Sequence, residues 1–351
     1  MSLLRAASLA VPQIRRLRDQ RNALIAERGD LVAARDALAA ERDHLLGEAA
    51  KHSLLRQNSP FFHYNTIFDP IAVIRRHAAP GLQPSPGYLT NYLGVRTDPK
   101  FFPTLLQDRA GEVEDVPIPG NWHADIAEWG AVLRAVELAR DSFTIIELGC
   151  GWGCWLNNAG VAARRRGLAV QLVGVEGDES HIGFAREACA TNGFSPDQVT
   201  LHRGIAAARD GMALFPRQDI GGEHWGLEPV FGASEEERQA AAASGRFDEL
   251  PMIALETLIA PHPRIDLLHI DIQGGEYDLL AGTLAVCKAK VAYIFVGTHS
   301  RSLEGRIMDM MLAEGWVPEI ERPAILKLDD GKPYTLIDGV QGWRNKALLP
   351  L

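Results

Sequence analysis

Cysteine is scarce in this chain, and its few cysteines are not spaced for metal or disulfide chemistry. The 351 residues include four cysteines, none of them in a Cys-x-x-Cys pair. We therefore expect neither a disulfide framework nor a cysteine-based zinc site, and this usage is typical of a reducing compartment. Cys150 and Cys154 flank a glycine-rich turn. We interpret them as small loop residues rather than metal ligands, because no histidine or second cysteine pair lies nearby in the sequence.

The chain also lacks a surplus of positive charge and a long apolar run. Its formal net charge is −9, whereas a protein that binds nucleic acid without sequence preference needs a basic face. We therefore expect no nucleic-acid partner. No apolar run approaches the roughly 20 residues that a membrane span requires, so no span is expected. The first residues lack the basic-then-apolar order of a signal peptide, which predicts a cytoplasmic location.

The N-terminal residues 1–57 contain a seven-residue repeat. Leucine recurs at this spacing from Leu17 to Leu45, and arginine does so from Arg21 to Arg42. The composition favours one long helix, and a seven-residue leucine period is typical of a coiled coil. We interpret residues 1–57 as a helical segment that makes a homo-oligomer. The alternative is a solvated helix that packs against the rest of its own chain.

The remaining sequence divides into an irregular part and a regular part. Residues 58–120 lose the periodicity and are rich in proline, glycine and aromatics, which suits a packed lid or substrate wall. Residues 121–351 open with a helix for which Asn121 is the expected N-cap. Strands and helices then alternate, which predicts an α/β fold with a parallel sheet covered on both faces. The expected strands cover residues 143–149, 169–177, 198–206, 265–272 and 291–298, with two late strands at 316–322 and 334–340.

A long interruption separates the third expected strand from the fourth. It covers residues 209–255, and its glycine- and tryptophan-rich first half is predicted to be a loop at the ligand-binding edge of the sheet. Ser234 and Glu237 have the spacing of a capping box, so a helix is expected to follow and to end at Gly245. We interpret this insertion as acceptor-binding.

Three glycines follow the first expected strand at every second position. The segment 144–155 reads TIIELGCGWGCW, with Gly149, Gly151 and Gly153 directly after Glu147 and one leucine. Glycine in such a place permits a tight turn and lets a ligand lie against the backbone. The spacing G-x-G-x-G differs from the dinucleotide pattern G-x-G-x-x-G, whose third glycine is replaced here by cysteine.

Two acids near this turn indicate what the ligand carries. Glu147 would repel a pyrophosphate but would bind a cationic amino group. Glu176 ends the second strand, where an acid holds ribose hydroxyls in nucleotide sites, and Asp178 is the adjacent alternative. A ligand with both a ribose and an amino-acid end satisfies these features, and S-adenosylmethionine is such a ligand.

The ordered motifs resemble those of a known enzyme family. IELGCGWG, VGVEGD and VTLHRGI are similar to the first three motifs of class I S-adenosylmethionine-dependent methyltransferases. ETLIAPHPRIDLLHIDIQGGEYDLLAG is similar to the signature of the FkbM-type branch, although Gln273 stands where an acid is commoner. The resemblance covers roughly residues 121–345. It implies a Rossmann-like, mostly parallel sheet of seven strands with an antiparallel last pair. The predicted N-terminal coiled coil and the aromatic segment before residue 121 lie outside it.

The resemblance also implies roles for the residues that match its cofactor motifs. Glu147 would hold the methionine amino group, the three glycines would let the cofactor approach, and Glu176 would take both ribose hydroxyls. Gly204 and Ile205 would flank the adenine. The structural alternatives are a helix-capping or ion-paired acid for Glu147 and a solvated strand-end acid for Glu176.

Methyl transfer to a hydroxyl requires a base within hydrogen-bond reach. Asp271 ends the fourth expected strand and His299 follows the fifth, at the edge where ligands of parallel sheets bind, so these two are the catalytic candidates. Asp271, Glu276 and His299 form an alternative divalent-metal site, which the spacing does not require. The structural alternatives are a helix cap for Asp271 and a loop hydrogen bond for His299.

Four further side chains are candidates for the acceptor site. Trp122 and His123 open the helix before the first strand, and His224 and Trp225 lie in the insertion, where Trp225 is predicted to stack on a sugar face. The alternative for each is ordinary loop packing. The resemblance implies a sugar hydroxyl as acceptor, in a nucleotide sugar, a polysaccharide or a glycosylated metabolite.

Two other functions remain open from the sequence. The glycine turn also permits a nicotinamide-dependent oxidoreductase, against which Glu147 and the missing third glycine count. The N-terminal repeat also permits a coiled-coil scaffold with a cofactor-binding domain in a surface-glycan assembly.

Overall fold

A computed structural model describes residues 59–350 and the helical positions 24, 28, 31, 34, 35, 37, 38, 41 and 42. The chain divides into two compact units, Met1–Pro60 and Phe61–Leu351. In the first unit, Leu24, Leu31 and Leu38 are helical and at least 64% exposed. Apart from these nine positions, the predicted coiled coil lies outside the described residues, so its extent stays a prediction. Within the described ranges, no helix is long and apolar enough to cross a membrane.

A mostly parallel sheet lies at the centre of the second unit. Its parallel strands are β4 (Ser142–Leu148), β5 (Ala169–Glu176), β6 (Val199–Arg203), β10 (Leu267–Ile270) and β11 (Tyr293–Thr298). Three more strands complete it: β1 (Asn65–Thr66), β12 (Val317–Arg322) and β15 (Gly339–Arg344). The order is β1-β12-β15-β11-β10-β4-β5-β6. The chain leaves β4 toward β5 and later returns beside β4 with β10, so a ligand crevice is expected at the carboxyl ends of β4 and β10.

The sheet differs from the predicted one in two places. It has eight strands instead of seven, because β1 pairs antiparallel with the edge strand β12. The second late strand, expected at 334–340, is also wrong, because these residues span two elements. Strand β14 (Lys332–Ile337) forms a separate hairpin with β13 (Ile325–Asp329), and the sheet strand β15 starts after it, antiparallel to both β11 and β12.

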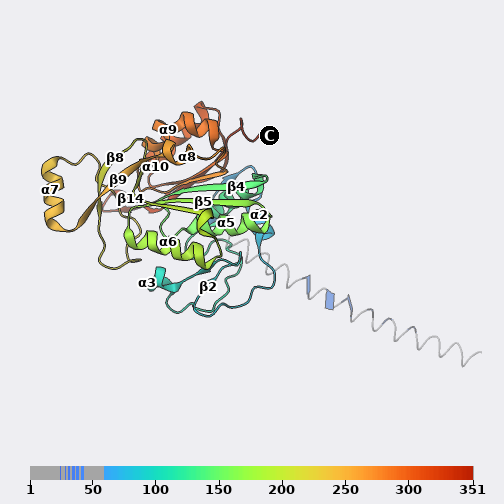
Figure 1. Ribbon diagram of the computed structural model, residues 1–351. Coiled ribbons are helices and arrows are strands. Elements are labelled where there is room, and N and C mark those ends of the chain that lie inside the picture. Colours follow the sequence, from blue (N-terminus) through green and yellow to red (C-terminus); the bar gives the residue numbers. More distant parts are fainter. Residues whose placement is uncertain are drawn as a thin grey trace, which may run out of the picture. The chain divides into compact units, whose positions relative to one another are not determined.

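Helices cover both faces of the sheet, as predicted. Helices α4 (Ile126–Leu138), α5 (Cys154–Arg165) and α6 (Glu179–Thr191) share one core with the sheet, and α8 (Leu255–Ile259), α9 (Glu276–Lys290) and α10 (Arg301–Ala313) share the other (Figure 1). In β4, Phe143 and Ile145 face the first core, whereas Ile146 and Leu148 face the second. Since successive side chains of a strand alternate between the faces, this burial on both sides explains the unbroken apolar runs.

Helix α4 begins later than predicted. Its N-cap is Asp125 rather than Asn121, and Glu128 completes a capping box in which each side chain accepts a backbone N–H group. The Asn121 side chain accepts N–H groups in the turn before the helix. Trp122 and His123 therefore lie in a turn, from which their rings reach the site described below.

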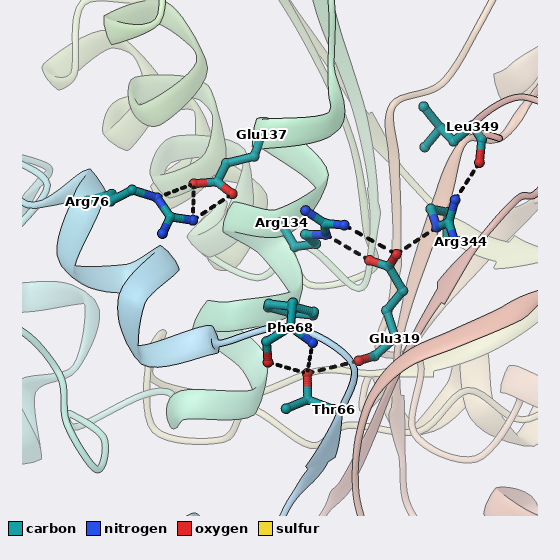
Figure 2. A network of polar contacts seen from close by, with 8 residues as sticks. All are labelled: Thr66, Phe68, Arg76, Arg134, Glu137, Glu319, Arg344 and Leu349. Carbon is teal, nitrogen blue, oxygen red and sulfur yellow. Dashed lines mark hydrogen bonds and ion pairs between the residues drawn. The ribbon is translucent and has the colours of Figure 1, made fainter. Parts of the chain in front are cut away.

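Residues 58–120 contain short elements that pack against the sheet domain. These are η1 (Pro60–Phe62), β1, α2 (Pro70–His77), β2 (Leu89–Thr90), β3 (Arg96–Thr97), η2 (Pro99–Phe101) and α3 (Pro103–Leu106). A polar network attaches this segment to the sheet edge (Figure 2). The Glu319 carboxylate is 2.6 Å from Nε of Arg344 and 2.9 Å from Nε of Arg134, and the Glu319 carbonyl accepts the Thr66 hydroxyl. The network thus joins β1, α4, β12 and β15.

The insertion after the third strand is a small subdomain. The expected strand 198–206 splits at Gly204 into β6 and β7 (Ile205–Ala207), and β7 joins β8 (Gly211–Pro216) and β9 (Phe247–Ala254) in a three-stranded sheet. The predicted helix is confirmed as α7 (Glu235–Ser244). It has the Ser234–Glu237 capping box and ends at Gly245 in the left-handed conformation.

Candidate active site

A cavity of about 840 Å³ opens where the parallel strands end. This size is within the range of small-molecule sites. Among the residues predicted from the sequence, the cavity is lined by Trp122, His123, Glu147, Gly149, Gly151, Glu176, Gly204, Ile205, His224, Trp225, Asp271 and His299. Gly153, Asp178 and Glu276 are outside its lining.

The glycine turn is crowded by the protein itself. Gly149 has a φ of 73°, and a methyl group there would overlap the backbone carbonyl oxygen of Asp271. Gly151 has a φ of 50°, and its methyl group would lie 3.0 Å from Cζ3 of Trp225. Gly149 therefore leaves room for the backbone at the end of β10, and Gly151 leaves room for Trp225 of the insertion. Both glycines also let a ligand lie along the turn.

Glu147 caps the helix that follows the turn. Its two carboxylate oxygens accept the backbone N–H groups of Trp155, at 3.1 Å, and Leu156, at 2.9 Å. A carboxylate at this position offsets the unpaired N–H groups and the positive end of α5. The structural alternative for Glu147 is thus realised, while the residue, only 1% exposed, still forms part of the cavity wall.

Glu176 ends β5 and faces the cavity. Its oxygens accept the backbone N–H groups of Gly151, at 2.9 Å, and Asp178, at 2.8 Å. Burial raises the pKa of Glu176 to about 7, although these hydrogen bonds lower it. Asp178 instead caps α6 by accepting the His181 N–H group. The structure therefore separates the two adjacent acids, and only Glu176 reaches the cavity.

Asp271, His299 and Glu276 form a carboxylate–imidazole–carboxylate cluster. His299 Nε2 is 3.1 Å from Asp271 Oδ1, and His299 Nδ1 is 2.8 Å from Glu276 Oε1. Burial lowers the pKa of His299, but the two carboxylates outweigh it and raise this pKa to about 10. Burial raises the pKa of Asp271, but the hydrogen bond and charge of His299 hold it below its usual value. At neutral pH the cluster therefore contains an imidazolium and an Asp271 carboxylate.

The geometry of this cluster does not match the alternative metal site. Each ring nitrogen of His299 faces a different carboxylate, so the three side chains do not converge on one point. Across the part of the chain that the structure describes, no group of three or more His, Cys, Asp and Glu residues is placed to hold a metal ion. Asp271 exposes 43% of its side chain, within the cavity lining, whereas Glu276 is fully buried.

Comparisons with known proteins identify the family. Residues 155–316 match the model of the methyltransferase FkbM domain. A putative methyltransferase from Jannaschia sp. (strain CCS1) is 46% identical over 275 residues, which cover 78% of this chain and 98% of that protein. The chain belongs to the FkbM methyltransferase family. The crystal structure of methyltransferase FkbM from Methylobacillus flagellatus KT is 12% identical, with a TM-score of 0.38, and the match covers 62% of this chain and 54% of that one.

The aromatic candidates of this FkbM-family methyltransferase line the cavity but pack mainly on each other. Trp225 is stacked between His181, 3.9 Å between ring centres, and Phe102, 4.2 Å away. Neither face of its indole is therefore open to a sugar ring, contrary to the predicted stacking. Trp122 packs edge-on against Phe102. Burial lowers the pKa of His123 to about 3, so its ring is neutral.

Sequence reasoning missed several polar residues of the cavity wall, among them Glu128, His269 and Asp338. Glu128 belongs to the capping box of α4, and burial, followed by the charge of Asp125, raises its pKa to about 8. His269 is buried on β10 with Nδ1 3.5 Å from a Glu147 oxygen, and a histidine inside an apolar strand was its available signal. Asp338 lies beside His299 in the segment whose strand was misplaced, and nothing in its sequence context marked it.

Proposed function

We propose that this protein is an S-adenosylmethionine-dependent O-methyltransferase that acts on a sugar hydroxyl in a polysaccharide, nucleotide sugar or glycosylated metabolite. One observation carries the proposal: the Asp271 carboxylate, ion-paired with His299, lines the same cavity as Glu176 and the glycine turn. A base and a ribose-binding acid in one cavity are what methyl transfer to a hydroxyl requires. Family membership favours this activity over the oxidoreductase alternative.

The residues at the glycine turn fit the cofactor. A carboxylate has about four lone-pair sites, and Glu176 uses two of them for backbone N–H groups. The remaining sites can accept the ribose hydroxyls. Glu147 has the same spare capacity for an amino group, directly or through water, and Gly204 and Ile205 line the wall proposed for the adenine. When bound, S-adenosylmethionine supplies an electrophilic methyl group on its sulfonium.

Asp271 is the proposed general base. It is ionised at neutral pH, and the carboxylate oxygen that does not face His299 would accept the proton that the acceptor hydroxyl loses. His299 is already protonated, so it positions Asp271 and stabilises its charge rather than acting as a base. Glu276 in turn holds His299 from its other nitrogen. The structure thus suggests different roles for residues that the sequence ranked together.

The proposed activity is tested first through its cofactor. S-adenosylhomocysteine is titrated calorimetrically into the wild type, Glu176→Ala and Glu179→Ala, with NAD as the control ligand. Glu179 is the matched control, because it lies three residues along the chain with 79% of its side chain exposed. We expect binding to the wild type and to Glu179→Ala, and weak or no binding to Glu176→Ala. The proposal would be overturned if the wild type bound NAD instead, or if Glu176→Ala bound S-adenosylhomocysteine as tightly as the wild type.

The proposed base is tested next. Asp271→Asn removes the proton acceptor while keeping the shape of the side chain, so methyl transfer to a sugar acceptor should fall roughly 10²- to 10⁴-fold. Binding of S-adenosylhomocysteine should stay close to that of the wild type. A variant that transfers methyl groups at the wild-type rate would remove Asp271 from the mechanism. The acceptor is found by screening glycans with a labelled methyl donor.

We also propose that the heptad leucines pair with those of a second copy of the chain. Leu24, Leu31 and Leu38 are helical and exposed within their own unit, which supports a seam between copies. Light scattering on the full chain and on a chain that starts at Phe61 tests this. We expect the full chain to form an oligomer and the shortened chain to be a monomer. If both chains are monomers, the proposed pairing is wrong. Methyl transfer by the shortened chain would count against the scaffold alternative.

A further inference from the structure

Trp225 lies directly on the glycine turn, although it comes from the insertion. A methyl group at Gly151 would lie 3.0 Å from the ring, and the N–H group of Gly151 bonds to Glu176. The ring partner of Trp225 on one side is His181, and His181 Nδ1 is 4.0 Å from Glu176 Oε1. All of these residues line the cavity. The indole therefore stands beside the carboxylate that we propose for the ribose.

The indole is held from several directions. His181 covers one face at an interplanar angle of 3°, and Phe102 covers the other at 15°. The indole N–H group donates to the carbonyl of Gly222 in the same loop, at 3.0 Å. Such stacks on two faces add attraction beyond the burial of the ring. Because the partners come from α6, from the residue after η2 and from the loop itself, the indole joins three parts of the cavity wall.

The loop that carries Trp225 also packs closely against the start of α6 and against η2. A methyl group at Gly221 would lie 2.6 Å from Cβ of Ser180, at the start of α6, and one at Gly222 would overlap the carbonyl oxygen of Phe101. Both glycines therefore permit a close approach that any side chain would prevent. Gln218 adds a hydrogen bond to His181, at 3.1 Å between Nε2 atoms.

We propose that loop 218–225 is a lid over the cofactor and that Trp225 is the residue that retains the cofactor. This inference rests on the proposed function, because it assumes that S-adenosylmethionine lies along the glycine turn. With the lid closed, the indole, His181 and Phe102 form an apolar wall that excludes water from the methyl donor. The loop is part of the connection 217–234 between β8 and α7. Ring stacks, close glycine packing and one side-chain hydrogen bond hold it against α6 and η2, so it can open as a unit when the cofactor exchanges.

The dissociation rate of S-adenosylhomocysteine tests this lid. Stopped-flow competition is applied to the wild type, Trp225→Ala, Trp225→Phe and Ile220→Ala. Ile220 is the matched control, because it is an apolar residue of the same loop, is 56% exposed and lies outside the cavity lining. Loss of two ring stacks predicts dissociation faster by about tenfold in Trp225→Ala. We expect a smaller change in Trp225→Phe and none in Ile220→Ala.

A lid also predicts faster association in Trp225→Ala, because entry no longer waits for the loop to open. His181→Ala, which removes one stacking partner and leaves Trp225 in place, should also release the ligand faster, and it serves as the second variant if Trp225→Ala does not fold. Circular dichroism checks the fold of each variant. If the wild type binds S-adenosylhomocysteine but both variants release it at the wild-type rate, the lid is refuted and the proposed function stands. If the wild type does not bind it, the proposed function itself fails.

Discussion

Replacing Glu276 with glutamine changes the charge of the acid behind His299 with little change of shape. Glu276 is fully buried, and its Oε1 accepts from His299 at 2.8 Å and from the Gly274 N–H group at 2.9 Å. Its Oε2 is buried without a hydrogen-bond partner. In Glu276→Gln the amide oxygen can keep the bonds of Oε1, and the amide nitrogen then takes the place of Oε2. The substitution therefore isolates the effect of one negative charge on the imidazolium.

The magnitude follows from the contact that is weakened. A hydrogen bond to a charged group contributes about 1.5–3 kcal/mol. In Glu276→Gln the imidazolium still donates to an oxygen, but this acceptor no longer carries a charge, so we expect the charged form of His299 to lose about 1–2 kcal/mol. At 1.36 kcal/mol per pKa unit, the pKa of His299 should fall by roughly one unit from its value of about 10. At neutral pH His299 still keeps its proton, so slower methyl transfer is expected only as the pH approaches the lowered pKa.

The sign of the pH dependence follows from the same pKa. In the folded protein it lies above the ordinary value of 6.5. The imidazolium therefore contributes its full stabilisation below about pH 6.5, and that contribution is lost as the pH rises through about 10. In Glu276→Gln this contribution should be lost at a pH about one unit lower. The variant should consequently unfold more easily than the wild type at neutral pH.

Nuclear magnetic resonance of the histidine rings measures this prediction directly. The His299 signal is assigned with His299→Gln and followed against pH in the wild type, in Glu276→Gln and in Glu314→Gln. Glu314 is a matched control, because it is an exposed acid whose partner is Lys288, on the surface. A His299 midpoint near 6.5 in the wild type, or the same midpoint in Glu276→Gln and the wild type, would refute the reasoning.

Two further predictions concern the fold and the cofactor. Gly149→Ala should lower the free energy of unfolding by several kcal/mol more than Gly167→Ala, as measured by chemical unfolding. Both glycines have a positive φ, and this left-handed strain alone costs about 1–2 kcal/mol. Only the methyl group at position 149 would also meet a neighbour, the carbonyl of Asp271. Equal costs would contradict the close packing of the turn. Affinity for S-adenosylhomocysteine should rise about tenfold from pH 6 to pH 8, as the Glu176 carboxyl ionises with a pKa of about 7. Glu176→Gln should flatten this dependence, and a wild-type affinity that does not change with pH would count against ribose binding by the carboxylate.

Much of the fold was predictable because it depends on local patterns. Apolar runs on either side of helical segments located the five parallel strands, and the capping box at Ser234 located α7 together with its end at Gly245. The edges of the sheet were not predictable in this way. The two-residue strand β1 and the boundary between β14 and β15 depend on pairing with distant strands, which leaves little trace in the local sequence.

The sequence by itself placed Glu176, Asp271 and His299 at the ligand edge of the sheet. Glu176 ends β5 and Asp271 directly follows β10, and these two strands flank β4 in the parallel sheet. The alternation of strands and helices is enough to bring the carboxyl ends of parallel strands to one edge. Strand order also indicated that His299 would lie near Asp271. These inferences need only the alternation of strands and helices, because every parallel strand of such a sheet points the same way.

Only the tertiary structure decided what these residues do there. Glu276 reaches His299 because the first turn of α9 faces the end of β11, and this contact helps to raise the pKa of the imidazole. Trp225 crosses from the insertion to the glycine turn and explains why Gly151 has no side chain. Such contacts join segments far apart in the chain, and their distances set the charges and the packing of the site. The sequence determined the candidates, and the packing between distant segments determined their chemistry.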